Sequence, residues 1–386
     1  MSTPSTFGYR LTQEMTPLGG KNAPIQPPSY SGGEFAVSEA KDGSKSVIIN
    51  NIGAEAHAMS DAMHAALGDD APGIFVDVID EKALDKEIKK AYTNAEKTGT
   101  NGSSLEVFSE LVLRRINEYP INTWTTSHRQ VDALIRYSTD PETGKQLWAD
   151  LDSPISSLIR TAGNGMALAE NFPNSALLGY WLSSRSPDWR KVPRSLRSII
   201  TGYGAEEVNA GAGKIGDILS GITKENNSVK INKDGGLTLT KSGGQAPSNA
   251  NLGSLPSDVK TALFRCDTIK REAILSTRGL THRLNVSDEM RNLLQALGIV
   301  SAVRGGEKGI YRSGCDLIVT DTLLEEVDSM GNTKEVDAQK TVDDALQVIE
   351  DNKHLLAAPI HTAMSSQIIS LVVSLVAGQM SKDKED

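Results

Sequence analysis

The stretch "PDWRKVPRSLRSIITGYG" at residues 187–204 is the most informative part of this sequence. Pro193 has a fixed backbone angle and disfavours a helical conformation at Val192, so an extended chain is expected there. The tail "SLRSIITGYG" alternates sufficiently between apolar and polar residues to predict a strand at a sheet edge. Residues 187–204 are therefore expected to form a loop that leads into a strand.

The same stretch concentrates positive charge in a chain whose formal net charge is −9. Between residues 185 and 197 one acid, Asp188, accompanies five cations: Arg185, Arg190, Lys191, Arg194 and Arg197. Such cations can neutralise phosphates, and Trp189 or Tyr203 can stack on a base. The alternative is that these residues form an ordinary solvated loop. Further cations earlier in the chain slightly favour anion binding, namely Arg114, Arg115, Arg129, Arg136 and Arg160.

Spacing distinguishes two of these arginines. Arg194 and Arg197 are three residues apart, so in an extended chain they are expected to face opposite sides. We therefore expect Arg194 to contact phosphate and Arg197 to pair with an acid of the same or a neighbouring subunit.

The composition of the 386 residues limits the class of protein. The length suits one large or two ordinary domains, and a hydrophobic content of 38% is that of a soluble globular chain. Cys266 and Cys315 do not make a disulfide framework, and the start lacks the pattern of a signal peptide. The most apolar stretch, "SQIISLVVSLVAGQM", is short for a membrane span, so a cytoplasmic protein is expected.

Strands and helices alternate, but the strands are few and the loops long, which favours an α+β fold. "SVIINNIGAEAHAMSDAMHAALG" predicts a strand followed by a helix, and "SSLEVFSELVLRRINEY" predicts a helix with a Ser cap. "SDEMRNLLQALGIV" predicts a capped helix that ends at Gly298. The Gly- and Ser-rich residues around "SVKIN" and "LTLTK" predict a flexible hairpin within a long insertion.

Three motifs that suggest chemistry are weak. "GAGKIG" at residues 211–216 matches a dinucleotide-binding pattern but does not follow a buried strand. His57, Asp61 and His64 share a helical face, but no nearby group completes a metal site, and a solvated or RNA-facing surface is the preferred interpretation. No arrangement typical of a catalytic nucleophile is present, so neither an enzyme nor a cofactor is expected.

Several blocks resemble the backbone subunit of type I CRISPR surveillance complexes, most closely subtype I-G, formerly I-U. The strongest is "FPNSALLGYWLSSRSPDWRKVPRSLRSIITGYG", in which Asn174, Ser175, Gly179 and Pro193–Leu196 match the family pattern. Further blocks follow in the expected order: "TPLGGKNAPIQPPSYSGG", "SVIINNIGAEAHAMSDAMHAAL", "SHRQVDALI", "LGSLPSDVK" and "LLQALGIVSAVRGGEKGIYRSGCDLIV". The chain departs from the pattern at residues 55–57, where it has Glu-Ala-His and the family has Gln-Ala-Asn. It also departs at Gly314, where the family has an arginine.

The resemblance implies a single hand-shaped domain over residues 1–386, with an RRM-like (ferredoxin-like) palm and large inserted finger and thumb segments. "SVIINNI", "IFVDVI" and two late strands are expected to build the palm. Three further segments are expected: a Pro/Gly-rich N-terminal segment at 1–45, a flexible thumb or finger at 205–255, and a C-terminal helical segment at 338–386.

The function implied is that of a CRISPR RNA-binding subunit in antiviral defence. Copies would form a helical filament along the guide RNA, present it for pairing with target DNA, and contact the large subunit and a guide-end-capping subunit. The RNA-binding candidates are His57, His128, Arg129, Arg160, Asn174, Arg185, Arg190, Lys191, Arg194, Arg197, Arg278 and Arg312. The alternative is a self-assembling structural protein, such as a phage or shell subunit, without nucleic acid.

Overall fold

The structure is a computed structural model that describes residues 6–29, 34–97, 104–150, 152–160, 165–182, 190–211, 228–231, 237–240 and 260–385. The chain divides into two compact units, each made of three separate segments. The first unit comprises Met1–Val76, Ile121–Val208 and Ala262–Thr362. The second comprises Asp77–Pro120, Asn209–Thr261 and Ala363–Asp386.

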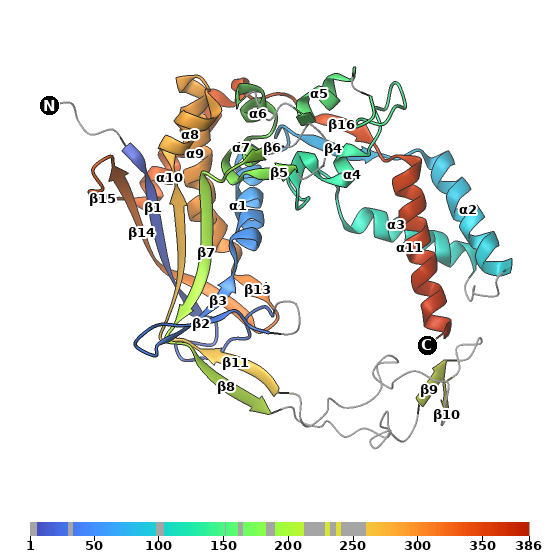
Figure 1. The fold of residues 1–386 in the computed structure, drawn as a ribbon, viewed down its shortest axis with the longest axis horizontal. Helices are drawn as coiled ribbons and strands as arrows, with labels where there is room; N and C mark the ends of the chain where they lie inside the picture. The colour runs from blue at the N-terminus through green and yellow to red at the C-terminus, as the bar shows by residue number, and fades with distance from the viewer. Residues whose placement is uncertain are drawn as a thin grey trace. The chain divides into compact units, whose positions relative to one another are not determined.

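A curled antiparallel sheet of eight strands forms the centre of the first unit (Figure 1). The strands follow the order β13-β14-β1-β12-β7-β3-β2, and β15 also pairs with β14. Their bounds are β1 Thr6–Pro17, β2 Val37–Glu39, β3 Lys45–Asn50, β7 Leu196–Tyr203, β12 Thr268–Leu275, β13 Ile310–Arg312, β14 Cys315–Asp328 and β15 Thr333–Val336. The fold is therefore mixed α+β, as the sequence predicts.

The strand predicted after Pro193 is confirmed as β7, but its predicted place at a sheet edge is wrong, because β7 pairs with β12 on one side and with β3 on the other. Leu196, Ser198 and Ile200 are buried on one face, whereas Arg197 is exposed on the other. In β7 and β12, alternate residues thus face the core, and the opposite face remains accessible.

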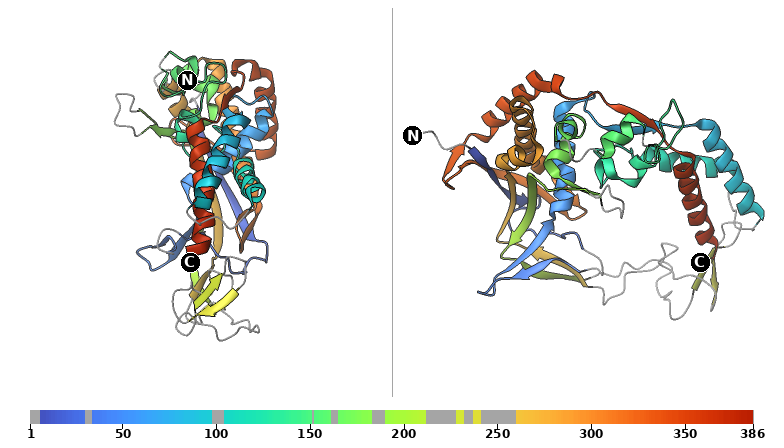
Figure 2. Two further views of the ribbon diagram at one scale, coloured as in Figure 1. Left: turned by 90° about the vertical axis from the view of Figure 1, so that its right-hand side faces the viewer. Right: turned by 45° about the horizontal axis from the view of Figure 1, so that its top comes forward.

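Helices cover the buried face of the sheet (Figures 1 and 2). Helix α1 packs on β7, α8 on β1 and α9 on β12, and α10 packs on α9. Their bounds are α1 Ile52–Leu67, α8 Thr277–Leu284, α9 Asp288–Arg304 and α10 Ala338–Asn352. Side-chain caps begin these helices: for example, the Asn51 side chain accepts hydrogen bonds from the first turn of α1.

Short elements connect the sheet to the rest of the first unit. They include the hairpin of β5 and β6 and a set of helices. Their bounds are η1 Arg129–Val131, α4 Ala133–Arg136, α5 Pro154–Arg160, α6 Gly165–Asn171, α7 Pro173–Leu178, β5 Tyr180–Leu182, β6 Arg190–Val192, η3 Gly305–Lys308 and η4 Lys353–Leu355.

The predicted end of a helix at Gly298 is wrong, because α9 continues to Arg304. Gly298 lies in the helix interior, where a Cβ atom would stand 2.8 Å from the nearest Leu275 side-chain atom. This glycine therefore allows α9 to approach β12 closely and does not end the helix.

The predicted placement of one strand is wrong, and the C-terminal helical segment contains a break. "IFVDVI" forms β4, Ile74–Val78, but it pairs with β16, Ile360–Ala363, and does not join the main sheet. The segment 338–386 contains α10 and α11, Ser366–Glu385, separated by η4 and β16. Pro359 lies in this break, and proline cannot continue a helix interior.

The second unit contains three packed helices: α11, α2 (Glu81–Lys97) and α3 (Leu105–Glu118). Each presents apolar residues to the others, namely Leu84 and Ile88 of α2, Phe108, Val112 and Ile116 of α3, and Ile369, Val373 and Val376 of α11. Among the described residues, no helix is long and apolar enough to cross a membrane.

The hairpin predicted from "SVKIN" and "LTLTK" is confirmed as β9, Ser228–Ile231, paired with β10, Leu237–Thr240. The two-stranded pair of β8, Glu206–Gly211, and β11, Lys260–Arg265, stands at the base of this insertion. Most of the remaining predicted insertion at 205–255 lies outside the described residues.

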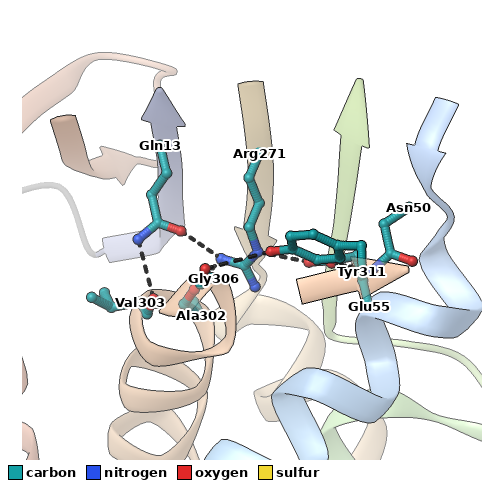
Figure 3. Close-up of polar contacts among 8 residues, drawn as sticks. All are labelled: Gln13, Asn50, Glu55, Arg271, Ala302, Val303, Gly306 and Tyr311. Atoms are coloured by element: carbon teal, nitrogen blue, oxygen red, sulfur yellow. Dashed lines mark hydrogen bonds and ion pairs between the residues drawn. The ribbon is translucent and has the colours of Figure 1, made fainter. Parts of the chain in front are cut away.

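A buried ion pair lies between the sheet and its helices (Figure 3). The Arg271 Nε atom of β12 is 2.6 Å from the Glu55 Oε2 atom of α1, and both side chains are fully buried. Arg271 Nη1 also donates to Gln13 Oε1 of β1 at 2.9 Å and to the Ala302 carbonyl of α9. This network therefore fixes how two helices and two strands meet.

Candidate functional site

A cleft of about 1000 Å³ lies within the first unit. Its walls come from the start of α1, the residues around η1 and α4, the β5–β6 hairpin, the approach to β7, and α8. The lining residues are Ile52, Ser127, His128, Arg129, Val131, Ala133, Arg136, Leu178, Gly179, Tyr180, Trp181, Leu182, Lys191, Val192, Pro193, Arg194, Arg197 and Arg283. Residues as far apart in the sequence as Ile52 and Arg283 thus form one surface.

The charge of the cleft is positive. Six arginines or lysines and one histidine line it, and among the described lining residues none is acidic. These basic residues are His128, Arg129, Arg136, Lys191, Arg194, Arg197 and Arg283. In a chain with a net charge of −9, this concentration creates a local potential that attracts anions.

Arg129 is the most constrained of these residues. Its side chain is 8% exposed and its φ of +53° lies in the left-handed region, which is costly for a residue with a side chain. The Arg129 Nη1 atom donates a hydrogen bond to the Gly179 carbonyl at 2.8 Å. Burial, and secondly the positive charge of Arg194, lower the pKa of Arg129 to about 10. A buried cation beside a second cation favours an anion in this cleft.

Gly179 allows the β5–β6 hairpin to lie against the approach to β7. Its φ is +69°, and a Cβ atom there would stand 2.5 Å from the Val192 carbonyl oxygen and 2.9 Å from the Arg194 nitrogen. The residue whose carbonyl Arg129 binds therefore lies against the backbone of Val192 and Arg194.

We expect Gly179→Ala to destabilise the protein by at least about 2 kcal/mol. The Gly179 backbone, with φ +69° and ψ 165°, lies in a region that is essentially restricted to glycine and costs alanine about 1–3 kcal/mol. The backbone clash adds an overpacking cost of about 1 kcal/mol or more. Gly144→Ala is the matched control, because Gly144 has a φ of +67° with no atom within 4 Å of its Cβ position. Urea unfolding of both variants measures the difference, and equal losses would contradict the proposed close approach.

An aromatic side chain accompanies the cations. Trp181 of β5 lies opposite Lys191 of β6 in the antiparallel register, and both line the cleft. The Trp181 side chain is 59% exposed. A cation beside an exposed indole is an arrangement that can bind a phosphate and stack a base.

The expectation that Arg194 and Arg197 face different surroundings is wrong, because both line the cleft. Arg194 precedes the bend at Ser195, and β7 begins only at Leu196, so the alternation of a strand does not relate the two side chains. Backbone hydrogen bonds hold the bend: Ser195 N donates to the Leu177 carbonyl and Ser276 N donates to the Ser195 carbonyl, both at 2.8 Å. Arg283 of α8 donates to the Arg194 carbonyl at 3.4 Å.

Arg136 and Arg160 flank one tryptophan. The Arg136 guanidinium lies 4.8 Å from a Trp148 ring centroid, and the Arg160 guanidinium lies 4.0 Å from it. Arg160 also donates to the Trp148 carbonyl and to the Ser156 hydroxyl. Arg136 lines the cleft, whereas Arg160 is not among the lining residues.

Other predicted residues lie away from the cleft. Asn174 is completely buried and donates to the Thr123 carbonyl at 2.9 Å. Arg312 donates to the Pro27 carbonyl at 3.0 Å, and the Arg278 guanidinium lies 5.7 Å from the Phe7 ring centroid. Arg185 and most of "GAGKIG" lie outside the described residues, as does the side chain of Arg190.

His57, Asp61 and His64, on the polar face of α1, are not among the residues that line the cleft. Burial, and secondly the charge of Arg129, lower the pKa of His57, whereas burial raises the pKa of Asp61. The His64 ring centroid lies 5.1 Å from that of Trp124. In the described part of the chain, no group of three His, Cys, Asp or Glu residues could hold a metal ion.

The list of RNA-binding candidates from the sequence omits two arginines and one exposed tryptophan that line the cleft, namely Arg136, Arg283 and Trp181. Trp181 and Arg136 lie close in sequence to predicted candidates, and this proximity is the sequence feature from which their place in the cleft could have been predicted. Arg283 reaches the cleft from α8, and nothing in its local sequence indicates this.

Comparison with known proteins identifies a family. Residues 9–207, more than half of the chain, match the family described as CRISPR-associated protein GSU0053. No curated protein sequence matches. A chain of the structure titled "CRISPR RNA-guided surveillance complex, pre-nicking" aligns with 8% identity and a TM-score of 0.35, covering 96% of this chain and 100% of its own. The crystal structure of Csc2 from Thermofilum pendens aligns with 9% identity and a TM-score of 0.27, covering 99% and 88%. This chain belongs to the CRISPR-associated protein GSU0053 family.

Proposed function

We propose that the cleft binds the sugar–phosphate backbone of CRISPR RNA. The observation that carries this proposal is the convergence of seven basic residues on one cleft with no acid among its described lining residues. RNA is a polyanion, and its phosphates are the groups that such a surface recognises without reading sequence. Membership of a CRISPR-associated family supports the choice of RNA over another polyanion.

The wider role that we propose is that of the backbone subunit of a subtype I-G surveillance complex. The curled antiparallel sheet would correspond to an RRM-like palm, and the insertion around β9 and β10 to a thumb or finger. Copies would stack along the guide, together with a large subunit and a guide-end-capping subunit, and the exposed guide would pair with target DNA. The chain would bind and position RNA and would not catalyse a reaction.

Salt dependence tests phosphate binding directly. Five cleft cations on the accessible surface, Arg136, Lys191, Arg194, Arg197 and Arg283, could each contact one phosphate. Each contact with a single strand adds about 0.7 to the slope of log affinity against log salt. Five contacts predict a slope of about −3.5, or about a hundredfold loss of affinity between 50 and 200 mM salt.

The experiment is a titration of labelled single-stranded RNA by fluorescence anisotropy at several salt concentrations. In parallel, the protein is co-expressed with a repeat–spacer array, and the RNA that co-purifies is extracted and sized. Discrete guide-length RNA and a steep slope support the proposal. Salt-independent binding, or assemblies that contain protein only, would overturn it.

A further inference from the structure

A second, smaller groove of about 390 Å³ adjoins the cleft. It shares three residues with the cleft, namely Arg194, Arg197 and Arg283. Its other lining residues are Phe7, Gly8, Tyr9, Arg10, Ser195, Ile274, Leu275, Ser276 and Val327. A ligand held by the shared arginines therefore has access to both cavities.

Apolar side chains form the floor of this groove. Phe7 lies near the start of β1 and Ile274 near the end of β12, and each is 42% exposed. Ile274 lies opposite Arg10 of β1 and opposite Arg197 of β7 in the antiparallel register. An exposed apolar residue thus stands directly beside one of the shared arginines.

The positive charge in the groove is unevenly distributed. Arg10 is occupied by Glu325, with its Nε atom 2.8 Å from Oε2 and its Nη2 atom 3.0 Å from Oε1. Arg194, Arg197 and Arg283 have no carboxylate within ion-pair distance among the described residues. At the side shared with the cleft, the groove therefore offers three arginines without a carboxylate partner in the described part of the chain. Its other side is lined by the exposed Phe7 and Ile274, and the Arg278 guanidinium lies 5.7 Å from the centroid of the Phe7 ring.

This asymmetry specifies the chemistry of the occupant. A free phosphate would leave Phe7 and Ile274 exposed, and an apolar peptide would leave three arginines without counter-charge. A nucleotide satisfies both sides, because its phosphate is anionic and its base has an apolar face that stacks on aromatic rings.

We propose that the groove holds a nucleobase of the bound RNA strand, with Phe7 against the face of the base and Ile274 beside it. The phosphate of the same nucleotide then lies at the shared arginines. This inference rests on the proposed function and adds a defined base subsite to it. Stacking on an aromatic ring tolerates every base, so the subsite is expected to accept all four.

The test compares two single-stranded RNA oligomers of equal length. One is oligouridylate, and the other carries the same phosphates with abasic riboses. Phe7→Ala is expected to weaken oligouridylate binding by about tenfold, within the range known for loss of one base–aromatic stack. It is expected to leave binding of the abasic oligomer unchanged, because the phosphate contacts remain.

Two control variants sharpen the result. Phe7→Tyr keeps the ring and should retain oligouridylate affinity. Ile318→Ala removes a 49% exposed side chain of β14 that does not line the groove, and it should have no effect. A thermal melt confirms folding in each case.

The outcomes separate this inference from the proposed function. If the unmodified protein binds neither oligomer in a salt-dependent manner, the proposed function fails. If it binds both but Phe7→Ala weakens both equally or neither, the base subsite is overturned while the phosphate cleft stands. If the groove instead holds an apolar side chain from a second copy of the chain, Phe7→Ala should change the oligomeric state. It should then not selectively weaken oligouridylate binding, and this result would also overturn the base subsite.

Discussion

Replacing Arg194 and Arg197 together by glutamate is expected to reduce the affinity for single-stranded RNA by about 10²- to 10⁴-fold. Both side chains line the cleft, and Arg194 also lies close enough to Arg129 to lower its pKa. A hydrogen bond to a charged group contributes about 1.5–3 kcal/mol, so the loss of two such contacts accounts for this range. Charge reversal adds repulsion of the phosphates, which favours its upper part.

The matched control for this variant is the double change Lys334→Glu and Lys340→Glu. It alters the net charge by the same amount, but both lysines are exposed on β15 and α10 and do not line the cleft. We expect it to lower affinity only slightly, through the weak long-range field. RNA co-purified per mole of protein and anisotropy titration give the two measurements, with a melting curve as the folding control.

Single reversals then test the corrected position of Arg197. Because the structure places both residues in the cleft, Arg194→Glu and Arg197→Glu should each weaken binding. A loss with Arg194→Glu alone would favour the original expectation that Arg197 pairs with an acid. Full RNA occupancy in the double variant would mean that the basic stretch is a solvated surface.

Local patterns predicted the elements of this fold better than their assembly. The strand at β7, the strand and helix at β3 and α1, and the β9–β10 hairpin each follow from alternation, periodicity and turn residues within their own segments. The placement of β4 beside β16 depends on a partner almost 300 residues away, and no local signal encodes it. Gly298 shows the same limit, because its role depends on the distant Leu275 side chain.

The residues of the candidate site likewise include some that the local sequence predicts and some that only the assembled fold reveals. His128, Arg129, Lys191, Arg194 and Arg197 were predicted from charge and motif, and the structure brings them together in one cleft. Asn174 matched the same motif, but it is buried, because a motif does not distinguish a residue that shapes the site from one that lines it. Arg283 could not be predicted, since only the packing of α8 brings it to the bend at Ser195.

Arg271→Leu is expected to cost about 3–5 kcal/mol of unfolding free energy, the usual cost of leaving a buried charge without its partner. Arg271 occupies an inward position of β12, where Ile269, Ala273 and Leu275 are apolar. Without its guanidinium, the Glu55 carboxylate stays buried, and its remaining side-chain partner among the described residues is the Asn50 amide, which donates to Glu55 Oε1 at 2.5 Å. Gln13 also loses a donor, although its own amide still donates to the Val303 carbonyl at 3.1 Å.

The second change Glu55→Gln should restore part of this loss. It removes the uncompensated charge but keeps an oxygen that can accept from Asn50, so we expect the double variant to be more stable than Arg271→Leu alone. Arg10→Leu is the surface control, because Arg10 pairs with Glu325 across the same sheet with its side chain 53% exposed. Such exposed pairs contribute about 0–1 kcal/mol. Urea unfolding of the four proteins measures the comparison. A double variant no more stable than the single one would show that Arg271 acts through packing and its bonds to Gln13 and Ala302, not through the charge of Glu55.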